Sequence, residues 1–247
     1  MKSDIYQFLT TLKYKTGALA LIDPDVKNDK RILDIIDKIN FADFDAILVG
    51  GSTLSDNKYL IRVKKIKELT SKPLILFPGS SNQLNSHVDA ILYLSLISGR
   101  NPKYLIDEHV KSSLKIYASN IETIPVGYIL IDGKNMSAVQ KESETTPIPA
   151  KQINRIISHV LAGQYLGYKF IFLEAGSGAK KHIGGELIKT LKSYLDIPII
   201  VGGGIVNSKI IRNIKKGNPD FMVIGNFLEE ANNKKEIKNM VNLIHGS

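Results

Sequence analysis

Short apolar runs and longer amphipathic segments alternate along the whole chain. Most of the short runs are almost continuously apolar, as in Ile199–Val201, which is typical of strands buried on both faces of a parallel sheet. The longer segments repeat apolar residues at helical spacing. The predicted strands cover residues 17–23, 45–51, 73–78, 90–96, 125–132, 169–174, 198–203 and 221–225, and the predicted helices cover 29–40, 57–70, 101–119, 150–166, 184–195, 207–216 and 229–245.

This order of elements predicts an α/β protein with a single (β/α)8 TIM-type barrel. The length of 247 residues suits such a barrel, which typically has ~250 residues. No Pro-, Ser- or Gly-rich linker divides the chain, so residues 1–247 are expected to form one domain.

The third helix of the barrel is expected to be absent or replaced. The segment between the third and fourth predicted strands, residues 79–89, is polar and lacks helical apolar spacing. Loss of a covering helix would leave apolar surface between its neighbours, which would form a groove for an apolar ligand. The alternative is a local irregularity that a loop or another subunit covers.

The composition and charge of the chain exclude several classes of site and partner. The chain has no Cys, which excludes disulfides, a thiolate nucleophile and a Cys-based zinc site, and makes the cytoplasm the expected location. No apolar run approaches the ~20 residues that cross a bilayer, so no transmembrane segment is expected. A net charge of +9 favours anionic ligands. Aromatic residues make up only 7% and are not interleaved with basic blocks, so nucleic acid is not an expected partner.

Glycine-rich segments follow several predicted strands, where barrels of this class place their active sites. Gly202–Gly204 follows the seventh strand and Gly225–Asn226 the eighth, which is the pair of strands whose loops commonly bind a phosphate. Glycine allows backbone N–H groups to approach phosphate oxygens closely. These loops therefore predict a phosphate site, although the same glycines would also suit tight turns between strand and helix.

Glu174 is the best candidate for a general base. It ends the apolar run Phe170–Leu173, and a carboxyl group at an apolar barrel mouth tends to have a raised pKa, which helps it to take a proton from an alcohol. The alternative is an ion pair with Lys180 or Lys181. The five histidines show no metal-ligand spacing and are expected to be structural or on the surface: His87, His109, His159, His182 and His245.

Oxygen ligands for Mg²⁺ follow the first two strands. Asp23 and Asp25 follow the first strand, and the hydroxyls of Ser52 and Thr53 follow the second. Mg²⁺ takes few protein ligands and shares the rest with water and substrate phosphates, so such a sparse site suggests a diphosphate substrate. The alternative is that one of the aspartates caps the next helix.

Six segments, taken together and in order, resemble the geranylgeranylglyceryl phosphate synthase family. They span essentially the whole chain: Leu21–Asp25, Val49–Thr53, Phe77–Gly79, Phe172–Ala179, Gly202–Ile205 and Val223–Asn226. The resemblance implies a barrel whose third helix is replaced. Two positions depart from the pattern. Phe172 stands where many members have Tyr, and Leu21 stands where some have Lys, so polar contacts from these two positions are not expected.

The resemblance implies a Mg²⁺-dependent prenyltransferase in which the 3-hydroxyl of sn-glycerol 1-phosphate attacks C1 of geranylgeranyl diphosphate or a related prenyl diphosphate. It implies Asp23 and Ser52 as metal ligands and Glu174 as the base. It also implies a homo-oligomer, and the lipid product suggests transient contact with a membrane surface. The implied substrate-binding residues are Phe172, Leu173, Glu174, Ala175, Gly176, Ser177, Gly178, Gly203, Gly204, Gly225 and Asn226.

Two other classes of function stay open at the level of sequence. Another phosphate-binding barrel enzyme, such as an isomerase or cyclase of a sugar phosphate, would need a second acid or base at the mouth and no lipid groove. A noncatalytic barrel would bind anionic lipid or nucleic acid through the charge of +9.

Overall fold

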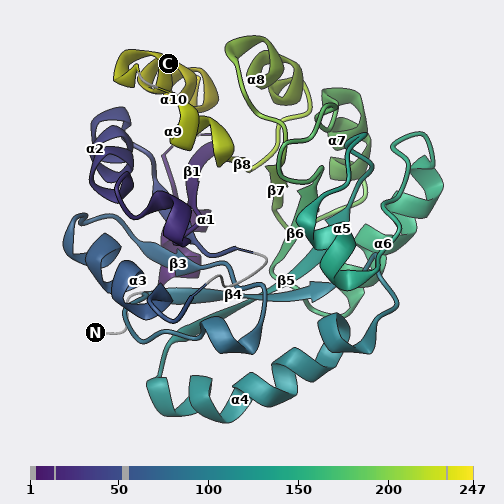
Figure 1. Ribbon diagram of the computed structural model, residues 1–247. Helices are drawn as coiled ribbons and strands as arrows, with labels where there is room; N and C mark the ends of the chain where they lie inside the picture. Colours follow the sequence, from purple (N-terminus) through teal and green to yellow (C-terminus); the bar gives the residue numbers. More distant parts are fainter. Residues whose placement is uncertain (1–3, 14, 52–55, 232, 247) are drawn as a thin grey trace.

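The computed structural model describes residues 4–13, 15–51, 56–231 and 233–246. Eight parallel strands close into a barrel in chain order, and helices surround it (Figure 1). The predicted fold class is therefore confirmed. The strands are β1 (Gly17–Ile22), β2 (Ala46–Val49), β3 (Leu74–Leu76), β4 (Ala90–Leu96), β5 (Glu122–Leu130), β6 (Phe170–Glu174), β7 (Ile199–Gly202) and β8 (Phe221–Ile224).

Each predicted helix has a counterpart in the structure. The helices predicted to end at Ser119 and His245 do so, whereas the other bounds differ from the prediction. A 3₁₀ turn, η1 (Val26–Asn28), precedes α2, and a π-helical turn, η3 (Lys103–Asp107), precedes α4. The helix predicted at 229–245 is wrong at its start, because a separate short helix, α9 (Asn226–Glu230), precedes α10. The seven counterparts are α2 (Ile32–Ala42), α3 (Tyr59–Glu68), α4 (Glu108–Ser119), α6 (Ile153–Tyr165), α7 (Gly185–Lys192), α8 (Ser208–Lys215) and α10 (Lys234–His245).

Two short helices, α1 (Ile5–Thr10) and α5 (Ala138–Ser143), have no counterpart in the prediction. The Glu122 carboxylate at the start of β5 accepts the backbone N–H groups of Ile5 and Tyr6 at 2.6 and 2.9 Å. The Tyr6 ring also meets Phe170, with ring centroids 5.5 Å apart. Because β5 and β6 begin at these contacts, α1 closes the amino-terminal end of the barrel.

The third helix is replaced, as predicted. Only a 3₁₀ turn, η2 (Ser81–Gln83), lies between β3 and β4. The buried Gln83 side chain donates to the carbonyl of Gly51 at 2.6 Å and accepts from the N–H of Gly79 at 3.0 Å. In place of helical hydrogen bonds, this segment therefore forms hydrogen bonds to the backbone that follows the second and third strands.

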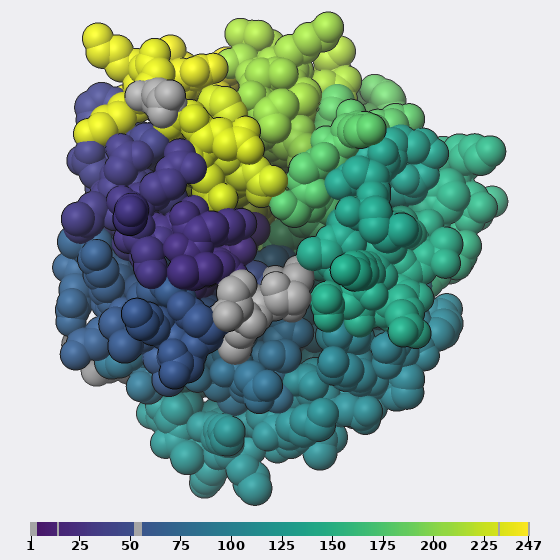
Figure 2. All heavy atoms as spheres, viewed as in Figure 1, coloured from purple at the N-terminus to yellow at the C-terminus, as the bar shows by residue number. Residues whose placement is uncertain are grey.

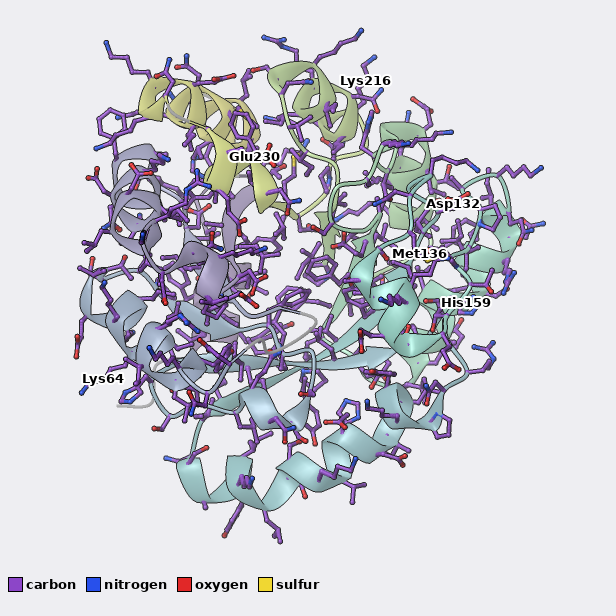
Figure 3. All side chains as sticks on the ribbon, in the orientation of Figure 1. Lys64, Asp132, Met136, His159, Lys216 and Glu230 are labelled. Carbon is purple, nitrogen blue, oxygen red and sulfur yellow. The ribbon has the colours of Figure 1, made fainter. Side chains whose placement is uncertain are left out.

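Apolar residues fill the inside of the barrel and the layer between strands and helices. Along β6, Phe170 and Phe172 point inward, whereas Ile171 and Leu173 pack beneath the helices, as the alternation of strand side chains requires. Charged residues gather outside: Lys64 and Lys216 lie on the outer ring of helices (Figure 3). Within the described ranges, every helix is too short or too polar to cross a membrane.

Candidate active site

A cavity of about 550 Å³ opens at the carboxyl ends of the strands. In the space-filling view the surface is hollowed near its centre, between the yellow end of the chain and the teal and green segments (Figure 2). The wall brings together eight of the residues predicted for the site: Asp23, Glu174, Ser177, Gly178, Gly203, Gly204, Gly225 and Asn226. Segments that are far apart in the sequence thus meet at one rim.

Four residues predicted to bind substrate do not line this cavity. Phe172 is buried inside the barrel, where its ring stacks on Phe77 at a centroid distance of 5.3 Å. Leu173 and Ala175 belong to the outer apolar layer, so the side chain of Leu173 faces away from the cavity. The backbone of Gly176 contacts Glu174. Substrate contacts of these four residues stay predictions.

Glu174 lies at the end of β6 with 7% of its surface exposed. Its Oε1 accepts the N–H of Gly176 at 2.6 Å, and a Cβ on Gly202 or Gly203 would lie 2.6 or 2.5 Å from its carboxylate oxygens. Burial raises the pKa of Glu174 to about 7, against the opposing effect of the Gly176 N–H. No Lys or Arg of the described chain is among the groups that shift this pKa, so the alternative pairing with Lys180 or Lys181 is not observed.

The glycine loops after β6 and β7 have left-handed backbone. Gly203 and Gly204 have φ of 86° and 69°, and Gly178 has φ of 68°, values that favour glycine for steric reasons. The Ser177 hydroxyl donates to Oδ1 of Asn226 at 2.9 Å, which joins the loop after β6 to the loop after β8. The backbone therefore needs glycine at these positions to form its turns.

Asp23 faces the cavity from the end of β1, beside a lysine. Its Oδ2 lies 3.2 Å from Nζ of Lys27, and burial raises the pKa of Asp23 while Lys27 opposes that shift. A Cβ on Gly51 would lie 2.5 Å from Oδ1 of Asp23, so this carboxylate fills the space that the glycine leaves. Asp25 accepts the N–H of Lys27 at 3.3 Å and caps η1. The capping role considered for these aspartates thus falls to Asp25.

The Asp23 carboxylate fits the oxygen donor that Mg²⁺ prefers. Ser52, the other predicted ligand, lies outside the described residues, as does Thr53. Within the described ranges, no group of three or more His, Asp and Glu side chains could hold a metal ion. A cation at Asp23 would therefore take most of its oxygens from substrate and water, as the sparse site in the sequence suggests.

The cavity continues into the region that the third helix would cover in a regular barrel. Leu84, Tyr93 and Tyr104 line this part together with His109. The Tyr93 hydroxyl donates to the backbone carbonyl of His109 at 2.8 Å, and the two rings meet edge to face at 4.4 Å. The structure thus shows an apolar extension of the site. It also places His109, expected to be structural or on the surface, on the cavity wall.

Arg62 on α3 ties together two loops that flank the site. Its side chain is 4% exposed, and its guanidinium donates to Asp29 after η1 and to both carboxylate oxygens of Asp56, at 2.6 Å each. One N–H also reaches the carbonyl of Pro24 at 3.4 Å, next to Asp23. Its hydrogen bonds lower the pKa of Asp56 to about 2. Arg62 therefore fixes the backbone that carries Asp23.

For the Mg²⁺-dependent prenyl transfer that the sequence resemblance implies, we expect Arg62→Met to lower kcat/KM for the prenyl diphosphate by roughly 10- to 100-fold, because small displacements of a positioned group are costly. The Mg²⁺ concentration at half-maximal rate of that reaction should rise as well, whereas the affinity for glycerol 1-phosphate should change little. Steady-state kinetics over a Mg²⁺ titration measure all three quantities. Arg212→Met, on the exposed side of α8, is the control. Equal kinetics in the two variants would contradict a positioning role for Arg62.

Four functional candidates were missed in the sequence, for different reasons. Lys27 is one of 33 basic residues, and only its spacing from Asp23 singles it out. Glu229, which lines the cavity from α9, falls in a segment predicted as a longer helix. Tyr128 and His109 also line the cavity, but they occupy positions that are typical of strand and helix interiors.

The sequence pattern of the PcrB family matches residues 10–244. The chain belongs to the PcrB family. Curated relatives of this PcrB-family chain include the geranylgeranylglyceryl phosphate synthase of Chitinophaga pinensis, which is 42% identical over 250 residues that cover 100% of this chain and 98% of the relative. The enzyme of the same name from Methanosphaera stadtmanae is 36% identical over 237 residues, with 95% and 96% of the two chains covered.

The crystal structure of (S)-3-O-geranylgeranylglyceryl phosphate synthase from Thermoplasma acidophilum, in complex with sn-glycerol-1-phosphate, has a TM-score of 0.92 to this PcrB-family chain. The two are 30% identical, and the match covers 100% of both. The resemblance found in the sequence is therefore confirmed, and this member of the PcrB family is an enzyme of the prenyltransferase class. A thiamine phosphate pyrophosphorylase from Pyrococcus furiosus, 12% identical with a TM-score of 0.62, shares the fold alone.

Proposed function

We propose that this protein joins the 3-hydroxyl of sn-glycerol 1-phosphate to C1 of a prenyl diphosphate, geranylgeranyl diphosphate or a related chain, and releases diphosphate. One observation carries the proposal: a buried carboxylate, Glu174, lines the same cavity as the glycine loops and Asp23, and this cavity has an apolar extension. This arrangement offers a base, two places for anionic groups and room for a hydrocarbon tail.

Each part of the site has a role in this reaction. The backbone of Gly203, Gly204 and Gly225, with Asn226, holds the phosphate of the glycerol substrate and orients its 3-hydroxyl toward Glu174. The carboxylate takes the hydroxyl proton as the new C1–O bond forms and the bond from C1 to the diphosphate oxygen breaks. The apolar extension buries the tail, at about 0.8 kcal/mol per CH₂, which the cost of ordering the chain offsets in part.

Asp23 and Ser52 would hold Mg²⁺, whose charge stabilises the departing diphosphate when it is bound. The carboxylate of Asp23, which faces the cavity, supports this assignment. The protein's own contribution at this point is to keep Asp23 at the cavity wall, through the space beside Gly51 and the loop that Asn28 and Arg62 hold.

We also infer a cytoplasmic homo-oligomer that meets the membrane surface when its lipid product leaves. Exposed apolar side chains on one face of α4 support self-association: Val110, Leu114 and Tyr117. The molar mass of the protein in solution, measured by light scattering or sedimentation, tests whether it self-associates.

A direct assay tests the proposed activity. The purified protein is incubated with glycerol 1-phosphate, Mg²⁺ and prenyl diphosphates of several lengths, and the product is identified by mass. We expect an ether of intact glycerol phosphate and the prenyl chain, dependent on both substrates and abolished by a chelator. Absence of an ether with every chain length would refute the proposal.

The pKa of Glu174, near 7, predicts the pH dependence of the reaction. A base must be ionised, so kcat/KM should rise with pH and level off above an apparent pKa near 7, falling roughly tenfold per pH unit well below it. The residual activity of Glu174→Gln should not fall in this way below pH 7. A fall caused by titration of the substrate phosphate would persist in the variant, so the comparison separates the two causes. A limb near 4.5, the ordinary value for Glu, would contradict the raised pKa.

A further inference from the structure

The cavity wall carries many more carboxylates than cations. Among the described residues that line it, Lys27 is the sole Lys or Arg, whereas six side chains bear carboxyl groups: Asp23, Asp25, Glu108, Glu142, Glu174 and Glu229. The substrates of the proposed function carry a phosphate and a diphosphate. Like charges at close range repel in such a partly dry site, so a mobile cation on the wall has a large effect on which anion binds.

Lys27 lies between two of these carboxylates. Its Nζ is 3.2 Å from Oδ2 of Asp23 and 3.7 Å from Oε2 of Glu229. The lysine side chain is 56% exposed, so its head can turn without crossing packed atoms. Its position beside Asp23 puts it at the part of the cavity that the proposed function assigns to the diphosphate.

Its neighbours do not depend on Lys27 for their positions. The buried amide of Asn28 donates to the backbone carbonyl of Asp23 at 2.8 Å and to Oε1 of Glu229 at 2.9 Å. These two bonds link the loop after β1 to α9 without the lysine. The ammonium group can therefore leave Asp23 while the loop and the two carboxylates stay where they are.

We propose that Lys27 is a diphosphate-binding residue that covers the Asp23 carboxylate until substrates arrive. In the free protein its charge offsets that of Asp23 and Glu229. When the prenyl diphosphate binds, the ammonium group turns to the diphosphate oxygens, and Asp23 is released to hold Mg²⁺. The inference rests on the proposed function, and it predicts effects of opposite sign on cation and diphosphate binding.

The test compares Lys27→Met and Lys27→Arg with the native protein and with Lys30→Met, which removes an exposed lysine of the same loop. Mn²⁺ serves as the cation probe, by electron paramagnetic resonance on the substrate-free protein. A prenyl thiolodiphosphate, which does not react, and glycerol 1-phosphate are the anion probes, by calorimetry. None of these readouts requires turnover.

For Lys27→Met we expect the affinity for the thiolodiphosphate to fall roughly 10- to 100-fold, as expected for loss of a charge-assisted hydrogen bond. Mn²⁺ affinity should rise several-fold, because the competing cation is gone, and glycerol 1-phosphate affinity should stay the same. Lys27→Arg should keep most of the thiolodiphosphate affinity, and Lys30→Met should match the native protein.

Unchanged thiolodiphosphate affinity in Lys27→Met would overturn the proposal, as would a loss confined to glycerol 1-phosphate or an unchanged or weaker affinity for Mn²⁺. Failure of the proposed function looks different, because the native protein itself would then bind no prenyl thiolodiphosphate.

Discussion

Glu174→Gln is expected to lower kcat by about 10²- to 10⁴-fold, the usual contribution of a positioned general base, while the affinity for glycerol 1-phosphate stays within a few-fold. Gln has nearly the same shape as Glu, and its carbonyl oxygen can still accept the N–H of Gly176. The pocket formed by Gly202 and Gly203 is therefore preserved while the proton acceptor is lost.

The rate of ether formation and calorimetry with glycerol 1-phosphate measure the two effects separately. Glu186→Gln is the matched control, because Glu186 is exposed on α7. Native rates in Glu174→Gln would show that another group takes the proton. Loss of glycerol phosphate affinity together with turnover would make Glu174 a binding residue instead.

The same variant should be more stable than the native protein at alkaline pH. The pKa of Glu174 is raised from 4.5 to about 7 on folding, so above pH 7 the folded chain must bury a carboxylate that the unfolded chain hydrates. At 1.36 kcal/mol per pKa unit, this costs about 3 kcal/mol. The cost is absent below pH 4.5, grows between 4.5 and 7, and is constant above. Urea unfolding of both proteins at pH 5 and pH 8 should show a much larger difference in stability at the higher pH.

Gly203→Ala is expected to reduce turnover by about 10²-fold or more, through displacement of Glu174. Gly203 has φ of 86°, and a Cβ there would lie 2.5 Å from Oε1 of Glu174 and 2.8 Å from the backbone nitrogen of Gly176. The new methyl group would push the carboxylate out of its place. It would also disturb the N–H that contacts this carboxylate, so both the position and the pKa of the base would change.

Gly167→Ala provides a control for backbone strain. Gly167 has the same φ of 86°, but no heavy atom lies within 4 Å of the place that its Cβ would take. Both variants bear the left-handed strain of about 1–2 kcal/mol, and only Gly203→Ala adds the collision. Thermal unfolding and steady-state kinetics of the pair distinguish the two effects. Equal turnover in both variants would show that Glu174 tolerates the displacement.

The sequence predicts those parts of the structure whose pattern of apolar and polar residues is long or repeated. Buried strands and amphipathic helices repeat around the barrel, so their periodicity fixes the fold class and the replaced third helix. Glu174 stands out because it is a charged residue at the end of an apolar strand. Asp23 stands out because its loop follows the first strand in a recognisable motif.

The parts that the sequence does not predict depend on tertiary contacts. Helices α1 and α5 have six residues each, too few for a clear period, and α1 is held by Glu122, more than a hundred positions away. Tyr93 and His109 line the cavity, yet their spacing is the same as that of residues in a packed core. Lys27 becomes a candidate only through its tertiary contacts with the carboxylates of Asp23 and Glu229.

The attachment of α1 also has a consequence for how the nascent chain matures. Its partners, Glu122 and Phe170, are synthesised long after Tyr6. At 5–20 residues per second, the ribosome needs on the order of 10–30 s to reach Phe170. During that interval the apolar face with Ile5 and Leu9 has no barrel on which to dock. Helix α1 is therefore synthesised well before the strands that hold it, and its apolar face stays uncovered until β5 and β6 are in place.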